Sequence, residues 1–235
     1  MTDPLMMSTC CPLDSGDVVP VLRCGRRWLS EILPGTGVAE LVTGFIRQRF
    51  LMAYGAEPVL RIPGLLALTT GQGSLLAAVG VRDASRERLF LEDYLTVPVE
   101  DVMPRPGLSR HRIAEIAHLA GVEAGVSQYL FTTLALWLNA AGFEWVVCTG
   151  TGQLRNSFHR LGIDTQVLAE ADPLRLPDQG AGWGRYYEHR PVVMAIHVQD
   201  TIAALEGTGL LRLARFLSAP NTRISSNGGR YGVIA

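Results

Sequence analysis

A carboxylate lies within an alternating run of apolar and polar residues in the middle of this chain. Residues 112–119 alternate with a period of two, which is typical of a β-strand. One predicted face carries Ile113, Ala117 and Leu119, with Glu115 interrupting it; the other carries Arg112, Ala114, Ile116 and His118. A partly buried Glu115 could act as a general base. The alternative is that Glu115 is only an edge-strand carboxylate.

A glycine-punctuated turn follows this strand. Gly121 and Gly125 precede Ser127, and the most apolar segment of the chain, residues 128–141, comes next. The pattern predicts strand, turn and buried helix, with Ser127 as the helix cap. Free backbone N–H groups and the positive end of the helix dipole would suit an anion such as a pyrophosphate. The alternative is that these glycines simply form a loop.

Other side chains in the sequence allow both a functional and a structural interpretation. Glu92 and Asp93 could bind a cationic substrate group, although adjacent acids often only flank a turn. Asn156 and His159 are three residues apart and share one side of a predicted helix. Cys148 is interpreted as a small core residue rather than a nucleophile.

Composition excludes several classes of chemistry. All 21 Lys or Arg residues are arginine, so a lysine Schiff base and a Walker-type phosphate loop are excluded. A formal net charge of −1 gives no reason to expect a nucleic acid or an anionic membrane as partner. The four cysteines show no paired zinc spacing, so no metal site is predicted.

The chain contains no apolar run of 18 residues, and no basic start followed by an apolar core precedes the first predicted helix. We therefore expect a cytoplasmic protein without stable membrane insertion. The 48% apolar and 18% charged content is that of a folded domain.

The remaining elements follow from periodicity and from glycine and proline punctuation. Residues 1–36 are interpreted as a loosely ordered lead-in with a short strand at 18–22, and 39–54 as a helix closed by Gly55. Strands are predicted at 58–62, 65–70, 74–82, 145–149, 167–169 and 192–198, and helices at 153–161 and 200–217, before a mobile tail. This order predicts an α+β or α/β domain with a mixed sheet and a central βαβ unit.

Several segments together resemble the bacterial thermostable haemolysin family. They span residues 40–198 in the family's order: 54–56, 89–95, 112–120, 144–147, 154–156, 161–162, 171–173 and 183–187. That family is similar to GNAT acyltransferases and, in outline, to acyl-homoserine lactone synthases. The resemblance implies a GNAT-like twisted sheet over residues 37–199, flanked by helices and followed by a C-terminal helix and tail at 200–235.

The resemblance also implies a donor site. The sheet would splay between strands 112–119 and 145–149, with a pantetheine arm in the splay and a pyrophosphate on the following turn. Donor-binding residues would then be Ala117, His118, Leu119, Gly121, Gly125, Ser127, Asn156 and Tyr187. Glu123 departs from the family pattern and would repel a pyrophosphate, so an acyl carrier protein is an alternative to acyl-coenzyme A. Either donor is a co-substrate, and no bound cofactor is expected.

The leading functional hypothesis is N-acyl transfer from such a thioester to a small-molecule amine. Glu115 would be the base, and Arg112 would either orient it or contact the carrier. Glu92, Asp93, Tyr94 and Arg47 would bind the acceptor. Two alternatives remain open. One is a membrane-active protein, as the family name suggests, using residues 201–217 as an amphipathic segment. The other is a non-catalytic module with a GNAT fold.

Overall fold

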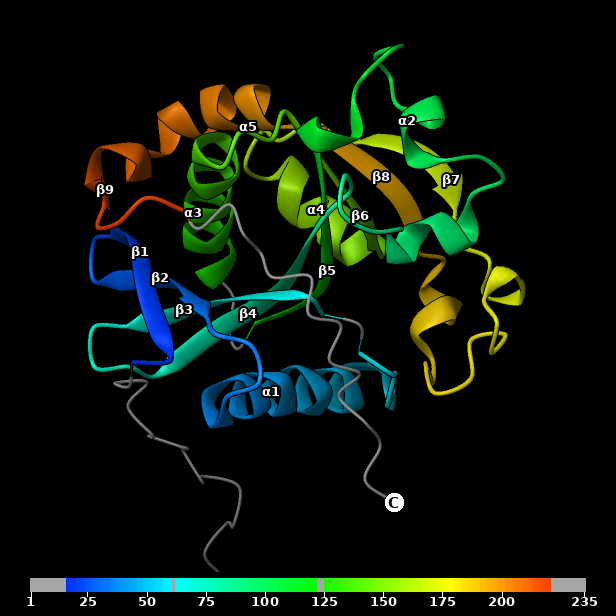
Figure 1. Cartoon of the computed structure of the whole chain (residues 1–235), viewed down its shortest axis with the longest axis horizontal. Helices are drawn as coiled ribbons and strands as arrows, with labels where there is room; N and C mark the ends of the chain where they lie inside the picture. The colour runs from blue at the N-terminus through cyan, green and yellow to red at the C-terminus, as the bar shows by residue number, and fades with distance from the viewer. Residues whose placement is uncertain (1–15, 61, 122–124, 221–235) are drawn as a thin grey trace, which may run out of the picture.

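The computed structural model describes residues 16–60, 62–121 and 125–220. Within these ranges, a single open sheet has the strand order β7-β8-β6-β5-β4-β3-β2-β1-β9 (Figure 1). Neighbouring strands are antiparallel except β5 and β6, which run parallel. The strands are β1 (Val18–Cys24), β2 (Arg27–Ile32), β3 (Gly64–Thr70), β4 (Leu75–Asp83), β5 (Ile113–Gly121), β6 (Trp145–Gly150), β7 (Gln166–Glu170), β8 (Val192–His197) and β9 (Ala214–Phe216).

Helices cover both faces of the sheet. Figure 1 shows α1 below it and α3 above it. The α-helices are α1 (Gly37–Tyr54), α2 (Val99–Val102), α3 (Val126–Ala140), α4 (Gly152–His159) and α5 (Val198–Leu205). Short 3-10 helices are η1 (Phe90–Tyr94), η2 (Arg110–Arg112), η3 (Pro173–Arg175), η4 (Tyr186–His189), η5 (Glu206–Thr208) and η6 (Leu210–Leu213). In the described part of the chain no helix is long and apolar enough to cross a membrane.

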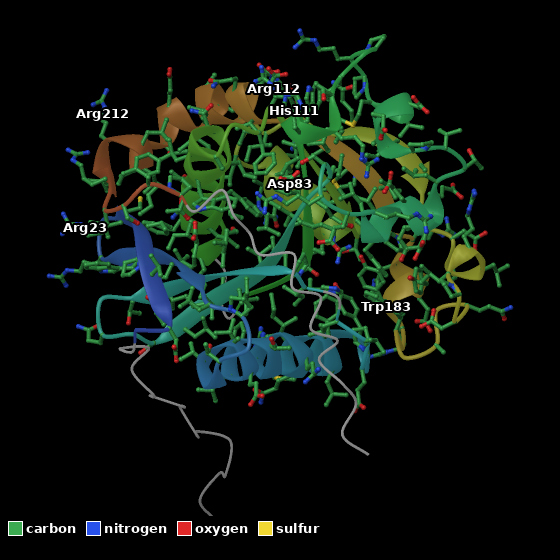
Figure 2. The ribbon with its side chains drawn as sticks, viewed as in Figure 1. Arg23, Asp83, His111, Arg112, Trp183 and Arg212 are labelled. Atoms are coloured by element: carbon green, nitrogen blue, oxygen red, sulfur yellow. The ribbon has the colours of Figure 1, made fainter. Side chains whose placement is uncertain are left out.

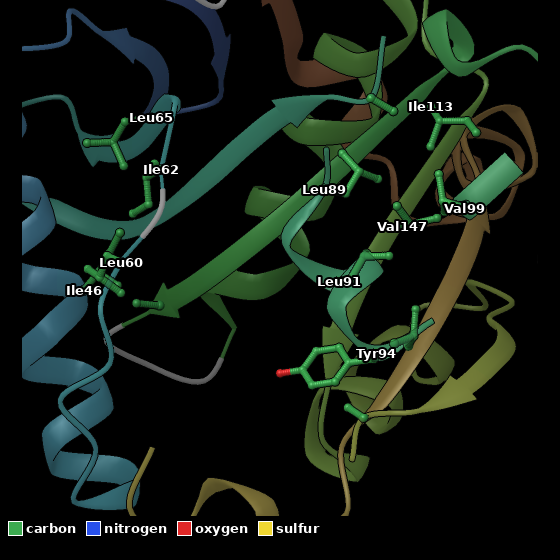
Figure 3. Close-up of a cluster of buried hydrophobic side chains, with 14 of the residues drawn as sticks. Ile46, Leu60, Ile62, Leu65, Leu89, Leu91, Tyr94, Val99, Ile113 and Val147 are labelled. Carbon is green, nitrogen blue, oxygen red and sulfur yellow. The ribbon is translucent and has the colours of Figure 1, made fainter. Parts of the chain in front are cut away.

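Two apolar clusters hold these layers together, one on each side of the sheet. The first joins α1, η1 and α2 to the lower face, and Figure 3 shows part of it around Ile46, Leu91, Tyr94 and Ile113. The second joins α3, α4 and α5 to the upper face and includes Trp137, Phe158 and Leu205. The strands in the middle of the sheet therefore have buried side chains on both faces, whereas the edge strands β7 and β9 are largely exposed. The predicted mixed sheet flanked by helices is confirmed.

The first helix illustrates how local sequence sets its ends. The Thr36 hydroxyl accepts a hydrogen bond from the Ala39 N–H at 3.2 Å, which caps the start. Gly55 ends the helix in the left-handed conformation, at φ 62°. The predicted helix with Gly55 at its end is confirmed, and it begins two residues earlier than predicted.

The N-terminal segment differs from its prediction. The short strand predicted at 18–22 is confirmed as β1, but the rest of the described lead-in is not loosely ordered: β1 and β2 form an antiparallel hairpin that pairs with β3. Residues 1–15 of the lead-in and the predicted mobile tail from residue 221 lie outside the described ranges. The helix predicted at 200–217 is also wrong: α5 ends at Leu205, and β9 pairs with β1. Residues 58–60, predicted as a strand, are irregular. The secondary structure of these regions is set by pairing between distant segments, and the periodicity within one segment does not reveal that pairing.

The predicted splay between the two parallel strands is present. Their ladder pairs Ile113 to Ile116 of β5 with Trp145 to Cys148 of β6. Beyond these residues, β5 continues to Gly121 along β4, and β6 continues to Gly150 along β8. The two strands therefore diverge at one level of the sheet.

A β-bulge lies on β5 at this same level. Opposite β4, the register moves from Gly80↔Ala117 to Ala78↔Ala120, so β5 carries one extra residue. His118 occupies it with φ 54°, in the left-handed region. The alternation predicted from sequence therefore holds from Ile113 to Ile116 and fails after it. His118 lies on the side of Glu115 and α1, whereas Leu119 packs against the α3 side.

Candidate functional site

A cavity of about 300 Å³ opens where β5 and β6 diverge, and we call it the splay cavity. Its floor is the β5 segment from Glu115 to Gly121 together with the end of β6 at Thr149 and Gly150. The C-terminal half of α1, η1 and the start of α4 form its walls. Trp183, from the segment before η4, and Tyr186, the first residue of η4, close it.

Aromatic rings form one side of the splay cavity. Trp183 stacks on His118, with ring centroids 6.1 Å apart and planes at 19°, and on Phe90 at 5.9 Å and 25°. Phe50 of α1 meets Trp183 edge-on, and Tyr186 packs against Trp183 at 5.2 Å. These rings come from α1, η1 and η4, so three segments distant in sequence converge on β5. Among these ring-bearing residues, only His118 was predicted from the sequence as a site residue.

A narrower apolar pocket of about 50 Å³ adjoins the splay cavity on the α3 side of the sheet. Its lining is mostly aliphatic and includes Leu134 and Ala135 of α3 and Ile163. Six residues line both spaces: Ile116, His118, Leu119, Phe131, Thr149 and Leu154. The splay cavity and the apolar pocket therefore meet at the point where the β5–β6 ladder ends.

Glu115 lines the splay cavity and is buried, as expected of an inward carboxylate. Its two oxygens accept hydrogen bonds from the Phe90 and Leu91 N–H groups, each at 2.8 Å, and from the Arg82 guanidinium at 3.2 Å. Burial raises the pKa of the Glu115 carboxyl, while Arg82 and the two N–H groups act in the opposite direction. Glu115 thus ties η1 to the sheet.

Arg112 does not orient Glu115, contrary to the prediction. It lies at the beginning of the strand and pairs with Glu144 at 2.9 Å, and Arg82 of β4 takes the predicted role. In Figure 2, Arg112 is at the top of the view and Trp183 at the lower right. Arg82 is opposite Glu115 in the antiparallel register, a neighbour that the sequence of β5 alone does not reveal.

The two acids predicted to bind the acceptor are engaged in ion pairs. Glu92 accepts from the Arg110 guanidinium at 2.8 Å and from the Leu89 and Val99 N–H groups. Burial alone would raise the pKa of Glu92, but these hydrogen bonds outweigh it and the pKa lies below its usual value. Asp93 pairs with Arg88 at 2.7 Å. Both acids lie outside the lining of the splay cavity.

Two tyrosines connect η1 to η4. The hydroxyls of Tyr94 and Tyr187 are 2.6 Å apart, and Tyr94 also lines the splay cavity. Burial raises the pKa of Tyr187 to about 12, so this pair is neutral at ordinary pH. Tyr187, predicted to bind the donor, therefore does not line the splay cavity itself but contacts Tyr94, which does.

The remaining predicted residues divide between the cavity and the surface. Ala117, Leu119, Gly121 and Ser127 line the splay cavity, as the donor-site prediction requires. Arg47 is exposed, and its neighbour Arg49 lines the cavity instead. The exposed Asn156 lines a separate shallow pocket with Thr151 and Arg160.

The predicted anion-binding turn is only partly described. Gly125, at φ 88°, is the N-cap of α3, so the prediction that Ser127 caps this helix is wrong. Ser127 lies in the first turn. The expectation for Glu123 concerns a residue outside the described ranges.

The open mixed sheet, splayed between its two parallel strands, defines a GNAT-like fold. Two solved structures share it at low identity. The acyl-homoserine lactone synthase LasI matches with a TM-score of 0.53 and 14% identity, covering 80% of this chain and 96% of that one. FeeM, an N-acyl amino acid synthase from uncultured soil microbes, matches with a TM-score of 0.51 and 13% identity, covering 75% and 93%.

The family model for thermostable hemolysin matches residues 35–202, and the chain belongs to that family. The search of curated proteins gave no match.

Proposed function

We propose that this protein is an N-acyltransferase that moves an acyl group from a thioester to a small-molecule amine. The observation that carries the proposal is the meeting of the splay cavity and the apolar pocket at the end of the β5–β6 ladder. An acyl thioester has an apolar chain on one side of its carbonyl and a polar pantetheine arm on the other. The two connected spaces match these two halves.

The strands that border the splay supply groups suited to a thioester. Beyond Ile116, the edge of β5 that faces the cavity presents backbone N–H and C=O groups, which can bond the amides of pantetheine as a neighbouring strand would. A backbone N–H at the carbonyl would stabilise the oxyanion of the tetrahedral intermediate. Acyl-coenzyme A and an acyl carrier protein deliver the same arm, and both are tested below.

We assign Glu115 a positioning role in place of the predicted role as base. Protonation would turn one of its acceptor oxygens into a donor facing N–H groups, and the hydrogen bonds to Phe90, Leu91 or Arg82 would be lost. As a fixed carboxylate it holds η1, and with it Phe90, against the splay cavity. This positioning role accounts for the hydrogen bonds of Glu115 to Phe90, Leu91 and Arg82.

The acceptor side is aromatic rather than acidic. Because Glu92 and Asp93 are paired with arginines, the ammonium form of an amine would meet the faces of Trp183, Tyr186 and Phe90. Such faces attract a cation and also accommodate a flat apolar body. We therefore propose a primary amine with an apolar or aromatic body as the acceptor class.

The test is thermal shift of the full chain with acetyl-, octanoyl- and palmitoyl-coenzyme A and with acyl-loaded carrier protein. A donor at 100 times its Kd should stabilise the protein by about 2.7 kcal/mol. Thr149→Trp should abolish the shift, because Thr149 lines both spaces, whereas Thr149→Ser should keep it. Release of free thiol with an amine then demonstrates transfer. No shift with any donor would refute the proposal, and a shift without turnover would indicate a binding module.

A further inference from the structure

We propose that His118 is the base that takes the proton from the attacking amine; this inference rests on the proposed acyl transfer. The sequence analysis placed His118 among donor-binding residues and on the opposite face of the strand. Its position in the structure comes from the bulge on β5. That irregularity brings an imidazole into a site whose carboxylate is already engaged.

The backbone at His118 is the first argument. It is one of three non-glycine residues with positive φ in the described ranges, and the only one within a strand. Non-glycine residues in this conformation are strained and cluster at functional sites. Bulges next to active sites re-aim a side chain. Here the extra residue turns the imidazole from the α3 side of the sheet to the side of Glu115 and α1.

The location of the imidazole is the second argument. His118 lines both the splay cavity and the apolar pocket, and it is the only ionisable side chain among the six residues they share. A thioester bound across the two spaces has its carbonyl carbon where they meet. The amine that attacks this carbon therefore presents its proton next to His118.

The packing of the ring is the third argument. Trp183 stacks on it at 6.1 Å, Phe50 meets it edge-on at 6.2 Å, and Phe90 lies at 6.0 Å with planes at 43°. Rings on three sides restrict the imidazole to one orientation, which general-base catalysis requires.

The other titratable groups around the splay cavity are less suited to take this proton. Glu115 of β5 is held by three donors, and Arg49 of α1 is a cation. Burial raises the pKa of Tyr94 of η1 and of Tyr186 of η4, so both are neutral hydroxyls. Cys148 of β6 lies in the apolar pocket, and burial raises its thiol pKa to about 12. Tyr54 is the remaining phenol in the lining.

The proposed step balances without any further reactant. The amine nitrogen attacks the thioester carbon, a C–N bond forms, and an imidazole nitrogen of His118 accepts the N–H proton. Collapse of the tetrahedral intermediate breaks the C–S bond. The imidazolium returns the proton to the departing thiolate, so an amide and a free thiol leave and His118 is neutral again.

The test compares His118→Asn and His118→Gly with the wild type, using octanoyl-coenzyme A and a panel of primary amines that includes benzylamine. Asn and Gly both tolerate the left-handed backbone, so these variants preserve the bulge. We expect kcat to fall roughly 100-fold or more in both. The thermal shift with octanoyl-coenzyme A should remain, and added imidazole should restore part of the activity of His118→Gly.

The pH profile provides the readout that a structural role would not change. Both proteins should lose kcat/KM as the acceptor amine becomes protonated. The wild type should show a further loss of kcat/KM as pH falls through the titration of one enzyme group, and His118→Asn should lack this additional limb. Turnover by His118→Asn within threefold of wild type, or an unchanged acid limb, would overturn the proposal while leaving acyl transfer intact. A wild type that neither binds nor cleaves any thioester would overturn both.

Discussion

Replacing Gly184 by alanine should loosen the segment that closes the splay cavity. Gly184 has φ 50°, and a β carbon there would lie well inside contact distance of the backbone carbonyl oxygens of Tyr54 and Gly55. The left-handed conformation costs an alanine about 1–2 kcal/mol. Overpacking against backbone adds about 1–3 kcal/mol. The penalty is therefore about 2–5 kcal/mol.

The interactions that hold this segment are stronger than the penalty, which decides how the strain is relieved. Arg185 N–H donates to the Tyr54 carbonyl at 2.8 Å, and Glu57 N–H donates to the Gly182 carbonyl at 2.6 Å. Each bond contributes about 1 kcal/mol net. Burial of Trp183 adds roughly 4–6 kcal/mol, from about 150–250 Å² at 25 cal/mol per Å². The hold, about 6–8 kcal/mol in all, exceeds the penalty, so the segment should stay in place on average but open locally far more often, while the sheet stays folded.

Three measurements check this prediction. Acrylamide should quench the fluorescence of the four tryptophans more readily than in the wild type, because Trp183 is exposed more often. The melting temperature should fall by about 6–12 °C for a central loss of about 3 kcal/mol, and the donor thermal shift should become smaller. Gly44→Ala is the matched control, because Gly44 lies within α1 with open space around it. This variant should be more stable than the wild type by up to about 1 kcal/mol in the free energy of unfolding. A Gly184→Ala protein with wild-type melting and wild-type quenching would refute this reasoning.

Three further substitutions test other parts of the structure. Glu92→Gln should lower the free energy of unfolding by about 1–3 kcal/mol at pH 7, since it loses charged hydrogen bonds to Arg110. Because the pKa of Glu92 is lowered in the folded state, its contribution to stability is complete above the ordinary value of 4.5 and is lost as pH falls through the folded pKa. Urea unfolding should therefore show the stabilities of the two proteins converging in acid. Ala135→Phe in the apolar pocket should shift donor preference toward acetyl-coenzyme A. The value of kcat/KM should fall roughly fourfold for each methylene of the acyl chain that the pocket can no longer bury, at about 0.8 kcal/mol each. An equal loss for all chain lengths would contradict this prediction. Arg112→Ala should leave turnover within about twofold, because Arg112 pairs with Glu144 away from the cavity; a large fall in kcat would restore its predicted role.

The sequence predicted those features of the fold that depend on local periodicity. The helix ending at Gly55 shows helical spacing, and the strands β3, β4 and β6 are apolar runs bounded by glycine or proline. In the N-terminal hairpin, β1 was predicted as a short strand, but β2 and the pairing were missed. The register is irregular at Pro20, and pairing with β3 and β9 stabilises the hairpin. Long-range pairing of this kind leaves little trace in a local pattern.

Charged residues were harder to assign than apolar ones. The sequence indicated that Glu115 points inward, but not that Arg82 and two N–H groups of η1 surround it. Glu92 similarly finds Arg110, 18 residues further along the chain. The partner of a buried acid is set by tertiary structure, and that partner decides whether the acid can serve a substrate.

The splay itself depends on irregularities in both strands at one level. On β5, the extra residue at His118 changes the strand's course directly after Ile116, the last residue paired with β6. On β6, Gly150 allows Leu154 of α4 to approach, since a β carbon there would lie 2.6 Å from its side chain. A regular β5 would keep His118 on the α3 face, and a larger residue at position 150 would displace Leu154, which lines both spaces. The bulge that opens the sheet therefore also delivers the imidazole, which couples the shape of the site to its proposed chemistry.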